Sequence, residues 1–108
     1  MIEILCGRDA SGFIRRLASV GHSGYAQAGE DIVCAAVSAL TQTAAIAFEE
    51  MEIGVTQVDE EAALLTIELP SHLPLNEMHD AQVILRTIIG GLAAIAEEYP
   101  DYVSIREV

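Results

Sequence analysis

The sequence contains no lysine and no tryptophan, and both absences restrict its fold and its partners. The five basic residues are all arginines, and they stand against 17 acidic residues, so the net charge is −12. Because such a surface repels phosphate, we expect no direct binding of nucleic acid or of an anionic membrane. The same charge attracts a strongly basic protein. Aromatic residues make up only 5% of the chain, so the core must consist of aliphatic side chains and alanine.

Cysteine is also scarce. Cys6 and Cys34 are too few for a disulfide framework, so we expect free thiols in a reducing cytoplasm. The first five residues include an early acid and no basic segment, so we expect no signal peptide. No uninterrupted apolar run reaches the roughly 18 residues that a membrane span needs. The spacings typical of metal sites, CxxC and HxxxH, do not occur, and we expect neither a metal nor a cofactor.

The hydrophobic patterning predicts a single domain covering residues 1–108, because 108 residues suffice for one core. Alternating side chains predict strands over 1–6 and 13–20, and a second hairpin over 53–58 and 62–69. Helical spacing predicts one helix after Asp31, a favourable N-cap, and another over 75–99 that stops at Pro100. A final strand covers 102–108. The order ββαββαβ indicates an α+β sandwich, in which two helices cover a mostly antiparallel sheet.

The second predicted helix has more apolar side chains than one buried seam requires. This surplus indicates a homodimer, although a core beneath the sheet would also account for Ile84, Ile88, Ile89, Leu92 and Ile95. Gly90 and Gly91 lie in the middle of the helix, where a glycine costs about 1 kcal/mol relative to alanine. We therefore expect a neighbouring element to approach closely at this point.

Residues 21–38 contain the candidate chemistry. His22 ends a predicted strand, and Cys34 lies in the first turn of the first helix, where unpaired amides favour a thiolate. The loop 23–29 is long enough to bring the two together, and a histidine within hydrogen-bond reach would activate the sulfur as a nucleophile. Ser38 and Thr41 share a helix face with Cys34. The Cys34 amide is a natural donor for an oxyanion.

Other interpretations of these residues stay open. A lone cysteine on an alanine-rich helix is often a small buried side chain, and a histidine at a strand end is often structural. Asp31 can be a helix cap only, and with Glu30 it opposes a thiolate electrostatically. A redox role would require Cys6 to lie beside Cys34. The three glycines of the loop do not form a phosphate-binding motif, because the spacing and the lysine of such motifs are missing.

The segment also resembles the signature of the bacterial ribosomal-processing cysteine proteases, the Prp family. The resemblance rests on GHSG at 21–24 and GEDIVCAAVS at 29–38, and it extends to length, element order and acidic character. It implies a cysteine endopeptidase that removes the N-terminal extension of large-subunit ribosomal protein twenty-seven, cutting after paired phenylalanines. It also implies a homodimer.

By position, the resemblance implies that His22 and Cys34 are catalytic and that Gly21, Asp31 and Ser38 support them. It further implies that the loop between the two gates access to the site, through Ser23, Gly24, Tyr25 and Gly29. We expect this loop to be mobile without substrate, because it contains glycines and only one bulky apolar residue.

The sequence therefore leaves two candidate functions. The first is a cytoplasmic thiol protease with a Cys34/His22 dyad that acts on a basic ribosomal protein precursor. The alternative is a non-catalytic, ribosome-associated module whose acidic surface holds a basic protein. Both explain the charge, but only the protease explains a histidine and a cysteine on either side of a glycine-containing loop.

Overall fold

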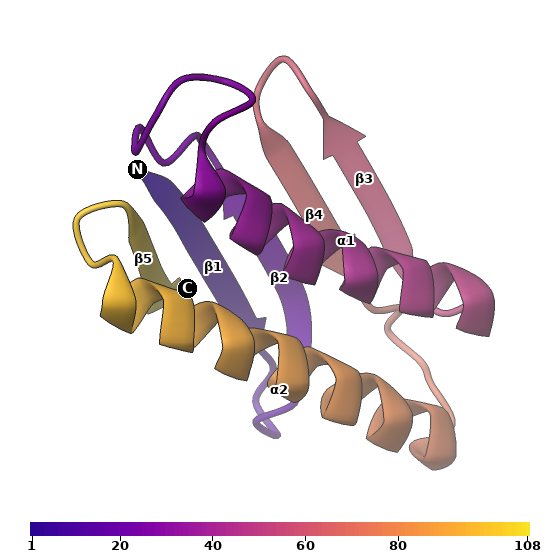
Figure 1. Cartoon of the computed structure of the whole chain (residues 1–108). Helices are drawn as coiled ribbons and strands as arrows, with labels where there is room; N and C mark the ends of the chain where they lie inside the picture. Colours follow the sequence, from indigo (N-terminus) through magenta and orange to yellow (C-terminus); the bar gives the residue numbers. More distant parts are fainter.

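A five-stranded sheet forms one layer of the protein (Figure 1). The structure is a computed structural model that describes all 108 residues. Its strands lie in the order β3-β4-β2-β1-β5. β1 pairs antiparallel with β2 and parallel with β5, while β4 pairs antiparallel with both β2 and β3. The predicted order ββαββαβ and the mostly antiparallel sheet are confirmed. The strands are β1 (Ile2–Arg8), β2 (Ile14–Val20), β3 (Val55–Asp59), β4 (Leu64–Glu68) and β5 (Val103–Glu107).

Two helices, α1 (Ile32–Met51) and α2 (Leu75–Glu98), lie side by side on the same face of the sheet (Figure 1). Alternation on β1 turns Ile2, Ile4 and Cys6 into the layer between sheet and helices, where all three are buried. As the composition predicts, the core is almost entirely aliphatic. Its largest inaccessible side chains are Phe48, Ile4, Ile14, Leu17, Ile67, Leu85 and Leu92.

By length and composition alone, α1 is long and apolar enough to cross a membrane. The sequence did not indicate this, because α1 contains no uninterrupted apolar run of that length. Core helices of globular proteins pass the same test. In this helix Val33, Val37 and Phe48 are buried in the core of the domain. Packing against the sheet therefore accounts for part of the apolar composition of α1, whereas Ile32 and Ile46 are exposed.

The apolar surplus of α2 is divided between core and surface. Ile88 and Leu92 are buried, whereas Ile84, Ile89 and Ile95 pack against the core while remaining half-buried. The expected close approach occurs at only one of the two glycines. A Cβ on Gly91 would lie 2.9 Å from a methyl carbon of Leu40 on α1, whereas a Cβ on Gly90 would meet nothing within 4 Å.

The two glycines therefore predict opposite responses to alanine. Gly90→Ala should raise the free energy of unfolding by about 1 kcal/mol, because it improves helix propensity without a clash. Gly91→Ala should give little or none of this gain, since the new methyl group presses on Leu40. Thermal unfolding of the two variants measures the difference. Equal stabilisation by both would contradict the close helix contact.

Candidate active site

The end of β2 is fixed by contacts that only glycine permits at position 21. The Gly21 amide donates to the Ala63 carbonyl at 2.9 Å, which joins the end of β2 to the segment just before β4. Gly21 has a φ of 96°, and a Cβ there would lie 2.7 Å from the Met1 carbonyl oxygen. The chain therefore turns sharply against the first residue of the protein, and His22 follows directly.

The Asp31 carboxylate binds both the start of α1 and the loop before it. One oxygen accepts from the amides of Val33 at 3.0 Å and Cys34 at 2.9 Å, which confirms the predicted N-cap. The other accepts from the Ser23 hydroxyl and from the Ala26 amide at 3.3 Å. Desolvation raises the pKa of this carboxyl, but the hydrogen bonds from Ser23 and the three amides outweigh it. They hold the pKa of Asp31 well below its usual range, so the group stays ionised.

Cys34 is half-buried, and Ser23 is its immediate neighbour. The Ser23 amide donates to the Cys34 sulfur at 3.3 Å, and the Ser23 hydroxyl oxygen lies 3.5 Å from the sulfur. The Cys34 amide is already bonded to Asp31. The expectation that this amide serves as the oxyanion donor is therefore not met in this conformation, because the cap occupies it. The backbone donor aimed at the sulfur is the Ser23 amide.

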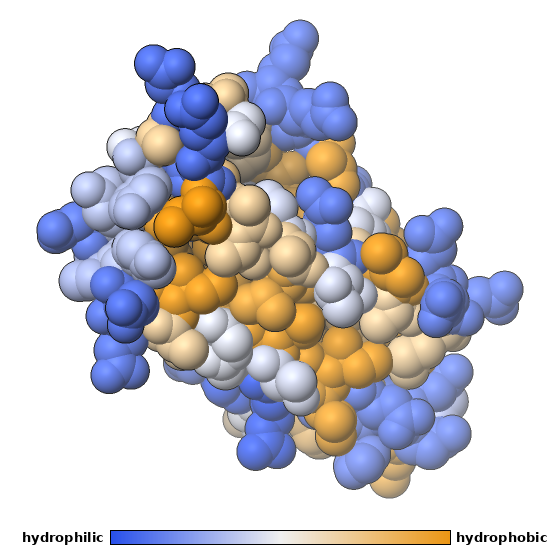
Figure 2. Space-filling model, viewed as in Figure 1, coloured by the Kyte–Doolittle hydropathy of each residue, from blue (hydrophilic) through white to orange (hydrophobic).

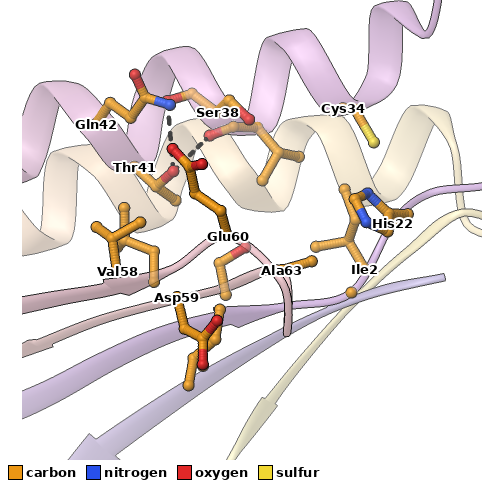
Figure 3. Close-up of a pocket in the computed structure, with 15 residues that line it drawn as sticks. Ile2, His22, Cys34, Ser38, Thr41, Gln42, Val58, Asp59, Glu60 and Ala63 are labelled. Carbon is orange, nitrogen blue, oxygen red and sulfur yellow. Dashed lines mark hydrogen bonds between the residues drawn. The ribbon is translucent and has the colours of Figure 1, made fainter. Parts of the chain in front are cut away.

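His22 lies on the other side of the sulfur. Figure 3 shows its ring and the Cys34 sulfur facing each other across a pocket between α1 and the sheet. His22 is exposed, and neither of its ring nitrogens forms a hydrogen bond within the protein. The structure thus brings the two residues together in one pocket, with the sulfur bonded to Ser23. Catalytic hydrogen bonds often tighten only when substrate is present.

Two pockets meet at His22, Cys34 and Ser38. The first has a volume of about 320 Å³ and lies between α1 and the turn that joins β3 to β4 (Figure 3). The second has a volume of about 460 Å³ and lies under the loop 23–29. A peptide that crosses the sulfur can therefore extend into both. Further lining residues are Thr41, Gln42, Asp59, Glu60 and Ala63 in the first pocket, and Gly24, Ala26, Ala28, Gly29 and Asp31 in the second.

The residues expected to form the gate do not share one environment. Gly24 and Gly29 line the second pocket, whereas Ser23 is buried beneath the loop, with 3% of its surface exposed. Tyr25 points away from both pockets and packs against Tyr99 and Tyr102. The loop is thus held at Ser23 and at Tyr25, although its sequence suggested that little fixes it.

Sequence reasoning missed the acidic wall of the first pocket. Asp59 and Glu60 fall between the two strands of the predicted second hairpin, yet they line the pocket that contains Cys34. Figure 3 shows the Glu60 side chain extending from this turn toward α1. The position of these two residues could have been predicted from the pairing of β4 with β2, in which Val20 lies opposite Leu64. That register brings the turn beside the residue that follows β2.

Cys6 has no part in this site. It is buried in the core and lies at the opposite end of β1 from Ile2, which lines the first pocket. Burial raises the pKa of its thiol, mainly by desolvation. Both cysteines are free, and Cys6 lines neither of the pockets that contain Cys34, so the two do not form a redox pair in this structure. The protein also has no group of three or more His, Cys, Asp or Glu side chains that could hold a metal ion.

Comparison with known proteins agrees with this geometry. The family model of the cysteine protease Prp matches residues 1–104. The ribosomal processing cysteine protease Prp of Mycoplasma pneumoniae is 32% identical over 92 residues, which are 85% of this chain and 86% of that protein. A crystal structure of Prp from S. aureus with a covalently linked product peptide has a TM-score of 0.89 at 24% identity, over the whole of both chains. A Streptococcus mutans protein has a TM-score of 0.83 at 28% identity, over all of this chain and 94% of that one.

These matches, together with a half-buried cysteine beside a histidine in a pocket, define the protein as a cysteine protease. More specifically, the chain belongs to the Prp family of ribosomal-processing cysteine proteases. The alternative of a non-catalytic acidic binding module is therefore not supported.

The contact at Gly21 predicts that position 21 is sensitive to substitution in a way that the left-handed glycines in open space are not. Gly21→Ala should displace either Met1 or His22 and reduce peptide cleavage strongly, because the methyl group would overlap backbone. Gly12→Ala is the matched control, since Gly12 also has a positive φ, of 87°, but lies in open space. Cleavage assays on both variants report displacement of the site, and thermal unfolding reports the backbone strain that the two variants share. Equal loss of cleavage in the two would contradict a specific role for Gly21.

Proposed function

We propose that this protein is an endopeptidase that removes the N-terminal extension of large-subunit ribosomal protein twenty-seven, with Cys34 as nucleophile and His22 as general base. The observation that carries the proposal is the position of the Cys34 sulfur, which faces His22 where two substrate-sized pockets meet. The Mycoplasma pneumoniae relative is a ribosomal processing protease by name. The S. aureus structures hold a substrate peptide in one case and a linked product peptide in the other.

In the proposed reaction, His22 takes the proton of the Cys34 thiol and the thiolate attacks the scissile carbonyl carbon. The first turn of α1 supports the negative sulfur through the helix dipole, and the Ser23 amide supports it by direct donation. The tetrahedral intermediate collapses as the C–N bond breaks, and His22 returns its proton to the leaving amine. Water then hydrolyses the thioester, with His22 again acting as base.

Three further residues position this pair. Gly21 allows the turn that delivers His22 to the pocket. Asp31 holds the first turn of α1 and the loop, and its four hydrogen-bond donors offset the repulsion between its charge and a thiolate. Ser38 lies one helical turn beyond Cys34 and lines both pockets, so it lies where a bound peptide would pass.

A basic substrate fits the charge around the site. Asp59 and Glu60 line the first pocket, and no arginine lines either pocket. The net charge of −12 adds a long-range attraction for a basic ribosomal protein. Both features favour binding of a substrate whose positive charge lies on one side of the cleavage point.

The protein acts in the cytoplasm as a homodimer in this proposal. The cytoplasmic setting follows from the class of substrate and agrees with two free cysteines. The dimer is implied by the family resemblance, and it is consistent with an apolar band on the helix layer between α1 and α2 (Figure 2). Sedimentation showing only an 11.5 kDa species at micromolar concentration would remove the dimer.

The dyad is tested with a peptide that carries an apolar, aromatic N-terminal extension followed by a basic segment. Cys34→Ala should abolish its cleavage, and His22→Ala should slow it by about 100-fold or more, because the base that generates the thiolate is lost. His79→Ala is the matched control, since His79 is exposed on α2 outside both pockets. Full activity of the His22→Ala enzyme would show that the dyad is wrong.

Electrostatic capture predicts a salt effect that depends on the substrate. When the basic peptide is at low concentration, added salt should lower its cleavage rate. The reason is that salt screens the electrostatic field of the protein over about 10 Å at 0.1 M. The rate at saturation should change little. Asp59→Asn combined with Glu60→Gln should weaken the salt dependence, as should a charge-neutral peptide that spans only the cut site. Equal salt dependence for the basic and neutral peptides would remove electrostatic capture from the mechanism.

A further inference from the structure

The loop 23–29 has one tie to the distant part of the fold, the ring of Tyr25. Its centroid lies 5.7 Å from that of Tyr99 and 5.2 Å from that of Tyr102, with interplanar angles of 86° and 76°. Edge-to-face contacts of this kind are attractive, because the positive ring edge meets the negative ring face. Figure 1 shows the loop at the same end of the molecule as the connection between α2 and β5, where both partner tyrosines lie.

The two partner tyrosines belong to the rigid part of the protein. Tyr99 ends α2, and its amide donates to the Ile95 carbonyl at 2.8 Å. The Tyr102 amide donates to the Tyr99 carbonyl, and the Tyr102 carbonyl accepts from the Ile2 amide at the start of β1. Both rings are half-buried and pack against the core. They form a fixed aromatic niche, defined here as Tyr99 with Tyr102.

The loop itself has few other restraints. The hydrogen bonds of residues 24–30 all end within the segment 23–31. Gly24 and Gly29 have positive φ values, and a Cβ on either would meet nothing within 4 Å, so these positions are not packed. Beyond the cluster of Ser23 and Asp31, the Tyr25 ring is therefore what fastens the loop to the remainder of the molecule.

The fastened loop lines the second pocket together with Cys34. We propose that Tyr25 is a latch that seats in the aromatic niche and holds the loop closed over Cys34, so that release of the ring opens the site. This inference rests on the proposed function and on the gating role that the family resemblance implies for the loop, and it adds the device that sets the balance between closed and open forms. Because the niche lies in the connection between α2 and β5, that balance is coupled to a part of the chain far in sequence from the nucleophile.

The latch is tested by the size of the reagent that reaches Cys34, in an assay that needs no proteolysis. The intact protein is labelled with iodoacetamide, which is small, and with a maleimide that carries a bulky fluorophore, and mass spectrometry locates the modified cysteine. The ratio of the bulky to the small labelling rate reports opening, because a change in thiolate content affects both reagents. Tyr25→Ala should raise this ratio about tenfold, since two edge-to-face contacts are lost.

Two variants serve as controls. Tyr25→Phe keeps the ring and should leave the ratio near that of the unaltered protein. Gln27→Ala alters an exposed side chain of the same loop and should also leave it unchanged. An unchanged ratio in Tyr25→Ala, or an equal rise in either control, overturns the latch. A protein that labels as expected but does not cleave the basic peptide would instead refute the proposed function and leave the latch standing.

Discussion

The Asp31 carboxylate is the interaction on which the arrangement of the site depends. Its two oxygens face different segments, one toward the amides that begin α1 and the other toward Ser23 and Ala26 of the loop. The same charge therefore fixes the turn that carries Cys34 and the segment that covers it. An ionised carboxylate suits this position because four donors converge on it, and they hold its pKa low. The cost is a negative charge close to a sulfur that becomes negative in the proposed reaction.

The sheet brings the remaining parts to this point. β2 lies between β1 and β4, so the residue that leaves its end meets the first residue of the chain on one side and the β3–β4 turn on the other. His22 is delivered by this strand end, and Asp59 and Glu60 by the turn. The chemistry therefore depends on strand register as much as on the loop and helix that carry the recognisable motif.

Much of the fold could be predicted because its signals are local. The cap at Asp31, the stop at Pro100 and the alternation in β1 each depend on neighbours along the chain, and the structure confirms all three elements. The parallel pairing of β5 with β1 and the seating of Tyr25 on Tyr99 depend on contacts between distant residues, for which the sequence has no pattern. The expected oxyanion role of the Cys34 amide is not met in this conformation for a physical reason, since the Asp31 cap and an oxyanion compete for the same N–H. A good N-cap two or three residues before a nucleophile is itself the warning of that competition.

The dual role of Asp31 is tested most directly by hydrogen–deuterium exchange of the amides in residues 21–36. In Asp31→Ala, both the Ala26 amide of the loop and the Val33 and Cys34 amides of α1 should exchange faster, because all three lose Asp31 as their acceptor. In Asp31→Asn, only the Ala26 amide should do so, since asparagine keeps one oxygen to cap the helix and replaces the other with a donor. Amides in α2 provide the internal reference. An Ala26 amide that stays protected in Asp31→Ala would contradict the account.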